Sequence, residues 1–143
     1  MIKLNDNIIK TNDNATVDLH EKIEGFEVRE ILHLLVGAWE GGSNYWIESV
    51  EIGGLPEKKT IVSSDYFPSF QLVPFLGGHL KVQLDEECDN EVYELNLEKI
   101  KQAIVLMRNH YNGHYCDWVE QNDDAATSDV FLQLCLFNEI IFG

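Results

Sequence analysis

Hydrophobic residues recur along this chain at spacings that predict helices on either side of a central group of strands. Within residues 28–40, apolar side chains return every three or four positions, which is typical of an amphipathic helix. Residues 97–109 repeat this spacing, and Asn96 before them is a suitable N-terminal cap. Residues 126–139 form the most apolar segment and predict a last helix that ends between residues 139 and 142. A short helix is expected between the last two, over residues 115–121.

Shorter segments between these helices have the composition and alternation of β-strands. Residues 45–52 are rich in aromatic and β-branched side chains, and residues 79–84 alternate apolar with polar. A return strand is expected over residues 91–95, with Val92 and Leu95 as its main apolar residues. We therefore predict one α+β domain over the whole chain, in which a small, mostly antiparallel sheet of three or four strands packs with about four helices.

Two segments give weaker patterns. Residues 1–14 are polar and predict a short strand or a loosely held arm, and a loosely packed N-terminal arm could extend over residues 1–25. Residues 60–76 mix aromatic side chains with prolines and predict an irregular segment, with room for one helical turn, that packs its aromatics onto the sheet. Glycines are expected to end two helices: Gly41 and Gly42 after the first, and Gly113 after the second.

The charge of the chain is unusual for a protein of this length. It holds 25 Asp and Glu against 10 Lys and Arg, a formal net charge of −15. Residues 82–98 and 109–143 together contain 13 of these acids and none of the bases. Such a field repels nucleic acid and anionic membranes and attracts basic proteins, although solubility alone would also explain it.

We therefore expect the two base-free segments to carry a binding surface for a basic protein. The candidate residues are Asp85, Glu86, Glu87, Asp89, Glu91, Asp117, Glu120, Asp123 and Asp124.

A second candidate site is the glycine-containing loop before the first long strand. Two glycines let a backbone approach another group closely, two polar side chains offer hydrogen bonds, and two aromatic rings follow. Such a loop suits a small ligand bound by stacking, with core packing of the aromatics as the other interpretation. The candidate residues are Gly41, Gly42, Ser43, Asn44, Tyr45 and Trp46.

The sequence carries no pattern for catalysis, a metal or a cofactor. His110 and His114 lie near Cys116 and Asp117, but Gly113 interrupts the helical spacing and the Glu of a His-Glu-x-x-His motif is missing. Neither a nucleophile motif nor a phosphate-binding glycine loop is present. We therefore predict a protein that is not an enzyme and binds no metal or cofactor.

Cysteine usage and hydropathy indicate a reducing, aqueous compartment. The three cysteines are odd in number and form no Cys-x-x-Cys pair, and we expect Cys135 to be a buried thiol. The first residues lack the apolar core of a signal peptide, and no apolar run approaches the roughly 18 residues of a membrane span. The aromatic content would suit a homodimer.

One polar residue lies inside the apolar last helix. Gln133, if buried, needs a hydrogen-bond partner or costs roughly 1–3 kcal/mol. We expect it either to face solvent or to cap a backbone group.

Three segments together resemble a known family. They are Glu-Gly-Gly-Ser-Asn-Tyr-Trp at 40–46, Val-Pro-Phe-Leu-Gly-Gly-His-Leu at 73–80, and the final segment 122–143, which includes Asp-Val-Phe-Leu-Gln. The chain resembles small acidic proteins encoded by bacteriophages and prophages, usually without an assigned function. Asn138 departs from the pattern, in which a glycine is expected.

The resemblance implies a phage accessory protein in the cytoplasm of the bacterial host. Combined with the charge, it suggests an inhibitor of a host defence system that presents a nucleic-acid-like acidic surface to a basic host protein, such as a defence nuclease. Two alternatives stay open. One is a sponge that sequesters a small nucleotide signal through residues 41–46, and the other is a phage structural or assembly protein.

Overall fold

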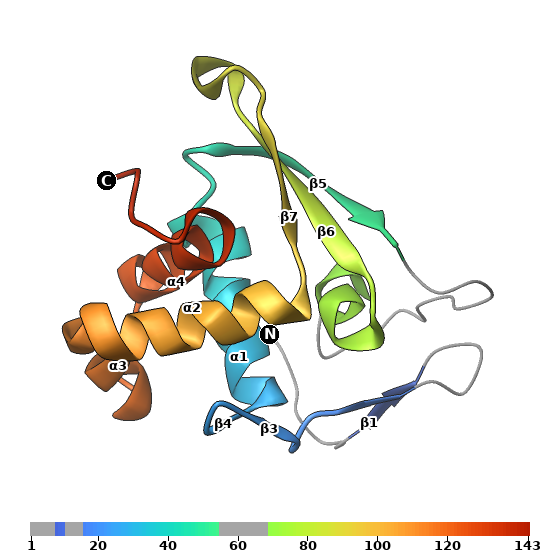
Figure 1. The fold of residues 1–143 in the computed structure, drawn as a ribbon, viewed down its shortest axis with the longest axis vertical. Helices are drawn as coiled ribbons and strands as arrows, with labels where there is room; N and C mark the ends of the chain where they lie inside the picture. The colour runs from blue at the N-terminus through green and yellow to red at the C-terminus, as the bar shows by residue number, and fades with distance from the viewer. Residues whose placement is uncertain (1–7, 11–15, 55–68) are drawn as a thin grey trace.

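The structure is a computed structural model that describes residues 8–10, 16–54 and 69–143. These residues form an α+β fold, as the hydrophobic pattern predicts (Figure 1). The α-helices are α1 (Val28–Gly37), α2 (Leu97–His110), α3 (Asn112–Val119) and α4 (Ala125–Phe137). The central antiparallel sheet has the order β5-β6-β7 and consists of β5 (Ile47–Gly53), β6 (His79–Leu84) and β7 (Val92–Leu95).

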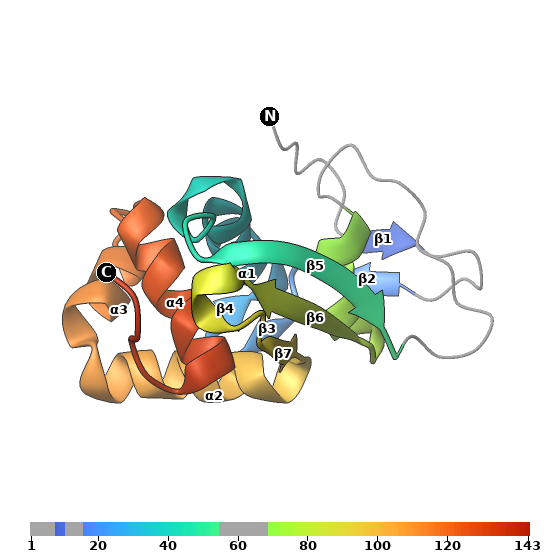
Figure 2. The ribbon, with the colours of Figure 1, turned by 90° about the horizontal axis from the view of Figure 1, so that it is seen from above.

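Helix α4 lies at the centre of the helical part and explains why its sequence is so apolar. It contacts α1, α2 and α3, and every residue from Thr127 to Leu136 is buried (Figure 2). A helix that is buried on every side needs apolar residues around its whole surface rather than on one face. Cys135 is buried there as predicted, and burial raises the pKa of its thiol.

Both ends of α4 are closed by specific caps. Asp124 accepts a hydrogen bond from the backbone N–H of Thr127 at 3.1 Å, and the Thr127 hydroxyl accepts one from the Asp124 N–H. At the other end, Asn138 has the left-handed φ of 61° and donates its N–H to the Leu134 carbonyl. Glycine and asparagine are the residues that adopt this conformation most readily, which explains why a glycine is expected at position 138.

The glycines do not end the two helices in the predicted way. Helix α1 continues into a π-helical turn, η1 (Ala38–Gly42), in which the Ser43 N–H bonds the Ala38 carbonyl. Gly41 and Gly42 are not left-handed; a side chain at Gly42 would instead collide with the Ala125 carbonyl oxygen, 2.4 Å from the added carbon. The second helix ends at His110, and Gly113 lies inside the next helix, α3.

The register of the hairpin corrects one prediction about the sheet. Leu95 pairs with Leu80 on the inner face and is fully buried. Val92 pairs with Gln83 on the other face and is 56% exposed, so it is not a core residue. Tyr93, which shares the parity of Leu95, packs against the core in its place.

The described residues of the N-terminal segment include two small antiparallel strand pairs. Strand β1 (Ile8–Lys10) pairs with β2 (Thr16–Asp18), and β3 (Lys22–Ile23) pairs with β4 (Phe26–Glu27). Since Leu19 is 1% exposed, the part of this segment around it packs into the core rather than forming a loose arm.

A 3-10 helix precedes β6. It is η2 (Ser69–Leu76), and its Leu72 and Val73 are buried; the rest of the aromatic segment 60–76 lies outside the described residues. In the described part of the chain, no helix combines the length and apolarity needed to cross a membrane.

Candidate functional site

The β6–β7 connection gathers the first group of predicted acidic residues on a projecting turn. Five of the seven residues from 85 to 91 are acidic, and a 3-10 turn, η3 (Glu86–Cys88), bends them into a compact tip. The Asp85 carbonyl accepts from Cys88 N–H at 3.0 Å and Asn90 N–H at 3.2 Å, which closes the turn. Figure 1 shows this tip at one end of the long axis of the molecule.

Local conformation explains why this sequence forms such a turn. Asp89 and Asn90 have left-handed φ values of 56° and 52°, a region that Asp and Asn tolerate better than other non-glycine residues. The side chains of the turn then point outward: four of the five carboxylates are exposed, and that of Asp85 is partly buried.

The crowded carboxylates change the titration of neighbouring groups. Burial raises the pKa of the Cys88 thiol, and the charges of Asp85, Glu87 and Glu91 raise it further. The hydrogen bond from the Tyr93 hydroxyl to Glu91 likewise raises the pKa of Tyr93. Burial is the largest cause for Cys88 and the hydrogen bond is the largest for Tyr93, and the nearby negative charges add to both shifts.

The second acidic group lies elsewhere on the molecule. Asp117 and Glu120 are exposed on and just after α3, and Asp123 and Asp124 are exposed in the link to α4. Figure 1 shows α3 well apart from the β6–β7 tip along the long axis, so the two groups are separate surfaces rather than one stripe. Asp124 also has a structural role, since it caps α4 through its hydrogen bond with Thr127. This bond lowers the pKa of Asp124.

Three side chains of the loop before β5 meet at one buried carboxylate. Asp129 of α4 accepts hydrogen bonds from the Ser43 hydroxyl at 2.7 Å, the Trp46 indole N–H at 2.8 Å and the Tyr45 hydroxyl at 2.7 Å. Gln133, one turn further along α4, donates a fourth at 3.1 Å. Ser43 and Trp46 are almost fully buried, whereas Tyr45 is 54% exposed. The side-chain donors of Ser43, Tyr45 and Trp46 are therefore occupied within the protein. The predicted ligand residue Asn44 is exposed.

Gln133 also holds the segment that follows α4. Its carbonyl oxygen accepts the backbone N–H groups of Ile141 and Phe142, each at 2.8 Å, and its amide donates to the Phe142 carbonyl at 3.1 Å. Phe142 stacks on Trp46 with ring centroids 5.2 Å apart. Of the two alternatives expected for Gln133, capping of backbone groups is confirmed, and exposure to solvent is wrong because the residue is fully buried.

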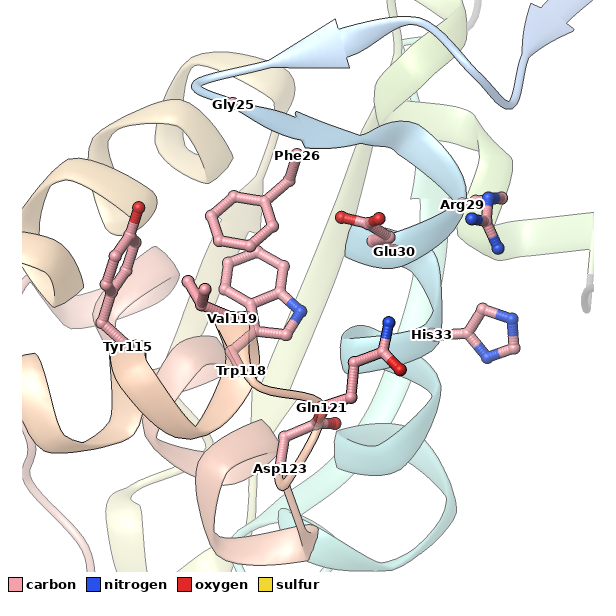
Figure 3. A pocket seen from close by; sticks show the side chains of 10 residues that line it. All are labelled: Gly25, Phe26, Arg29, Glu30, His33, Tyr115, Trp118, Val119, Gln121 and Asp123. Carbon is pink, nitrogen blue, oxygen red and sulfur yellow. The ribbon is translucent and has the colours of Figure 1, made fainter.

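A cavity of about 650 Å³ lies between α1, β4 and α3 (Figure 3). The rings of Phe26 and Trp118 stack along one wall with centroids 3.6 Å apart. Glu30 and Asp123 contribute carboxylates and Arg29 a guanidinium, so the lining carries both signs of charge. None of the loop residues 41–46 lines this cavity.

The histidine cluster considered for a metal is not assembled. Among the described residues, no group of three His, Cys, Asp or Glu side chains is placed to hold a metal ion. Cys116 instead donates to the Asn112 side chain at 3.4 Å within α3.

Sequence reasoning missed the central role of Asp129, which it counted only as one acid among many. The available signal was its spacing from Gln133: two polar residues four positions apart share one face of an otherwise apolar helix. Such a pair predicts buried polar partners, which here come from the loop at 43–46.

In comparisons with protein families, curated proteins and solved structures, nothing matches this chain.

Proposed function

We propose that this chain is a non-enzymatic binding protein that offers its acidic β6–β7 turn to a basic protein of a bacterial host. The observation that carries this proposal is the turn itself, which projects from the molecule and holds five acidic residues within seven positions, four of them exposed. Residues 82–98 contain no Lys or Arg that would neutralise them. A basic groove that binds nucleic acid meets a similar density of negative charge on duplex DNA, about one charge per 1.7 Å.

The second acidic group supports the same function at longer range. Residues 109–143 hold six acids and no Lys or Arg. Because the α3–α4 surface lies apart from the turn, we infer that it attracts a basic partner without touching it. Charges of this kind raise the rate of association more than the lifetime of the complex.

The resemblance to phage-encoded proteins supports a partner within host defence. A basic protein such as a defence nuclease would be blocked by an acidic surface that occupies its nucleic-acid groove. On this proposal the protein acts in the host cytoplasm. The nucleotide-sponge hypothesis has less support, since Ser43 and Trp46 already donate to Asp129.

Capture of host proteins by the immobilised chain tests the proposal. We expect one or a few basic proteins to bind at low salt and to elute as salt rises, because exposed charges are screened. The pair Glu86→Gln and Glu87→Gln should reduce capture strongly. The matched pair Asp117→Asn and Glu120→Gln removes the same charge from α3 and should reduce it less. Equal capture by the Glu86/Glu87 variant and wild type, or no retention of any host protein, would refute the proposal.

A further inference from the structure

A groove of about 270 Å³ lies directly beside the acidic turn. One wall comes from the hairpin and includes Tyr93, and the other comes from Phe137 and Phe142 at and after the end of α4. Asp89 and Glu91 of the turn also line it, and none of the lining residues that the structure describes is a Lys or Arg. The groove therefore combines aromatic walls with negatively charged carboxylates.

The walls are fixed in place without a ligand. Tyr93 meets Phe137 edge-on with ring centroids 4.8 Å apart, and Phe137 meets Phe142 at 5.9 Å. Phe142 is held by its backbone bonds to Gln133 and by stacking on Trp46. A site that is formed before binding loses less conformational entropy when it is occupied.

The carboxylates stand where they can meet a charged group in the groove. Asp89 and Glu91 are exposed, and Glu91 is oriented by the hydrogen bond from the Tyr93 hydroxyl. The raised pKa values of Cys88 and Tyr93, which both line the groove, agree with a negative potential inside it. A cation is therefore favoured there over a neutral or anionic group.

We propose that this groove receives the side chain of an arginine from the basic partner, an inference that rests on the proposed function. The aliphatic stem and the guanidinium plane pack against the aromatic walls, and the guanidinium donates to Asp89 and Glu91. The groove holds roughly nine water-sized groups at about 30 Å³ each, on the order of one arginine side chain. Arginine fits better than lysine because its planar fork both stacks and pairs with carboxylates.

An NMR titration of the isotopically labelled chain with the tripeptide acetyl-Gly-Arg-Gly-amide tests this assignment. We expect millimolar binding, with amide shifts concentrated at residues 88–93 and 141–142. The citrulline tripeptide, which has nearly the same shape without the charge, should bind at least fivefold more weakly. The pair Asp89→Asn and Glu91→Gln should weaken arginine binding at least threefold, and asparagine suits the left-handed backbone at position 89. The control pair Asp117→Asn and Glu120→Gln should bind like wild type.

Several results would overturn the inference. They are equal shifts with the citrulline tripeptide, no effect of the Asp89/Glu91 pair, no shifts at all, or shifts that map instead to the cavity lined by Phe26 and Trp118. If any of these results is found while capture of a host protein still depends on Glu86 and Glu87, the assignment of the groove to arginine is wrong and the proposed function stands. If the tripeptide binds as expected but no host protein is captured, the proposed function fails on its own.

Discussion

At the scale of single residues, Asp129 does more for the structure than any of the exposed acids. It receives four hydrogen bonds and joins the loop at 43–46 to the middle of the chain's most buried helix. A buried charge is tolerable only when its lone pairs are satisfied in this way. The Asp129 carboxylate therefore has a structural role.

Replacing Asp129 with asparagine should destabilise the protein by about 2–3 kcal/mol. Each carboxylate oxygen accepts two hydrogen bonds, and the amide nitrogen that replaces one of them cannot accept either bond. Urea unfolding measures this free energy. Asp123→Asn makes the same charge change at an exposed site, and it should alter the free energy of unfolding by less than about 0.5 kcal/mol. Similar effects of the two substitutions would contradict the role assigned to Asp129.

Tyr45 should make stability depend on pH in the alkaline range. Desolvation of its hydroxyl and its hydrogen bond to Asp129 raise its pKa from 10.0 to about 12. A group whose pKa is raised by folding stabilises the protein below its unfolded pKa and loses that contribution as pH rises through the folded value. Wild type should therefore lose stability relative to Tyr45→Phe between pH 10 and about 12. Unfolding curves at several pH values measure the difference, and a pH-independent difference would contradict it.

At the scale of elements, the end of α4 and the segment after it depend on two side chains. Asn138 provides the left-handed turn that ends the helix, and Gln133 binds the backbone that comes back over it. Together they place Phe142 against Trp46, and Phe142 forms part of one wall of the groove beside the acidic turn.

The substitution Asn138→Gly should stabilise the protein by up to about 1 kcal/mol, because glycine has no side chain to oppose a positive φ. Asn138→Ala should destabilise it by about 1 kcal/mol at the same site. Thermal unfolding distinguishes the two. If glycine and alanine shift the midpoint in the same direction, the left-handed cap does not control the stability of this turn.

The substitution Gln133→Leu should release the segment after α4 while most of the fold persists. Without the glutamine oxygen, the N–H groups of Ile141 and Phe142 lose their acceptor. Amide hydrogen exchange should become about tenfold faster or more at these two residues, which corresponds to roughly 1.4 kcal/mol of lost protection. Gln102→Leu, an equivalent change on the exposed side of α2, should leave their exchange unchanged.

At the scale of the whole molecule, local patterns predicted the fold class, the four α-helices and the strands of the central sheet. Long-range contacts determined which candidate residues are buried and which lie on the same surface. The alternation at 79–84 and the apolarity after residue 125 each act within one element, so β6 and α4 appear nearly where predicted. The Asp129 contacts join residues 83 to 86 positions apart, and no local pattern records them. Whether the acids share a face also depended on packing, which places them on two separate surfaces.

The affinity of the captured partner for three forms of the chain tests the central claim most directly. These forms are wild type, the pair Glu86→Gln and Glu87→Gln on the turn, and the pair Asp117→Asn and Glu120→Gln on α3. We predict that the turn variant binds about tenfold more weakly, roughly 1.4 kcal/mol, and that the α3 variant stays within about threefold of wild type. Equal affinity of the turn variant and wild type at low salt would contradict the account.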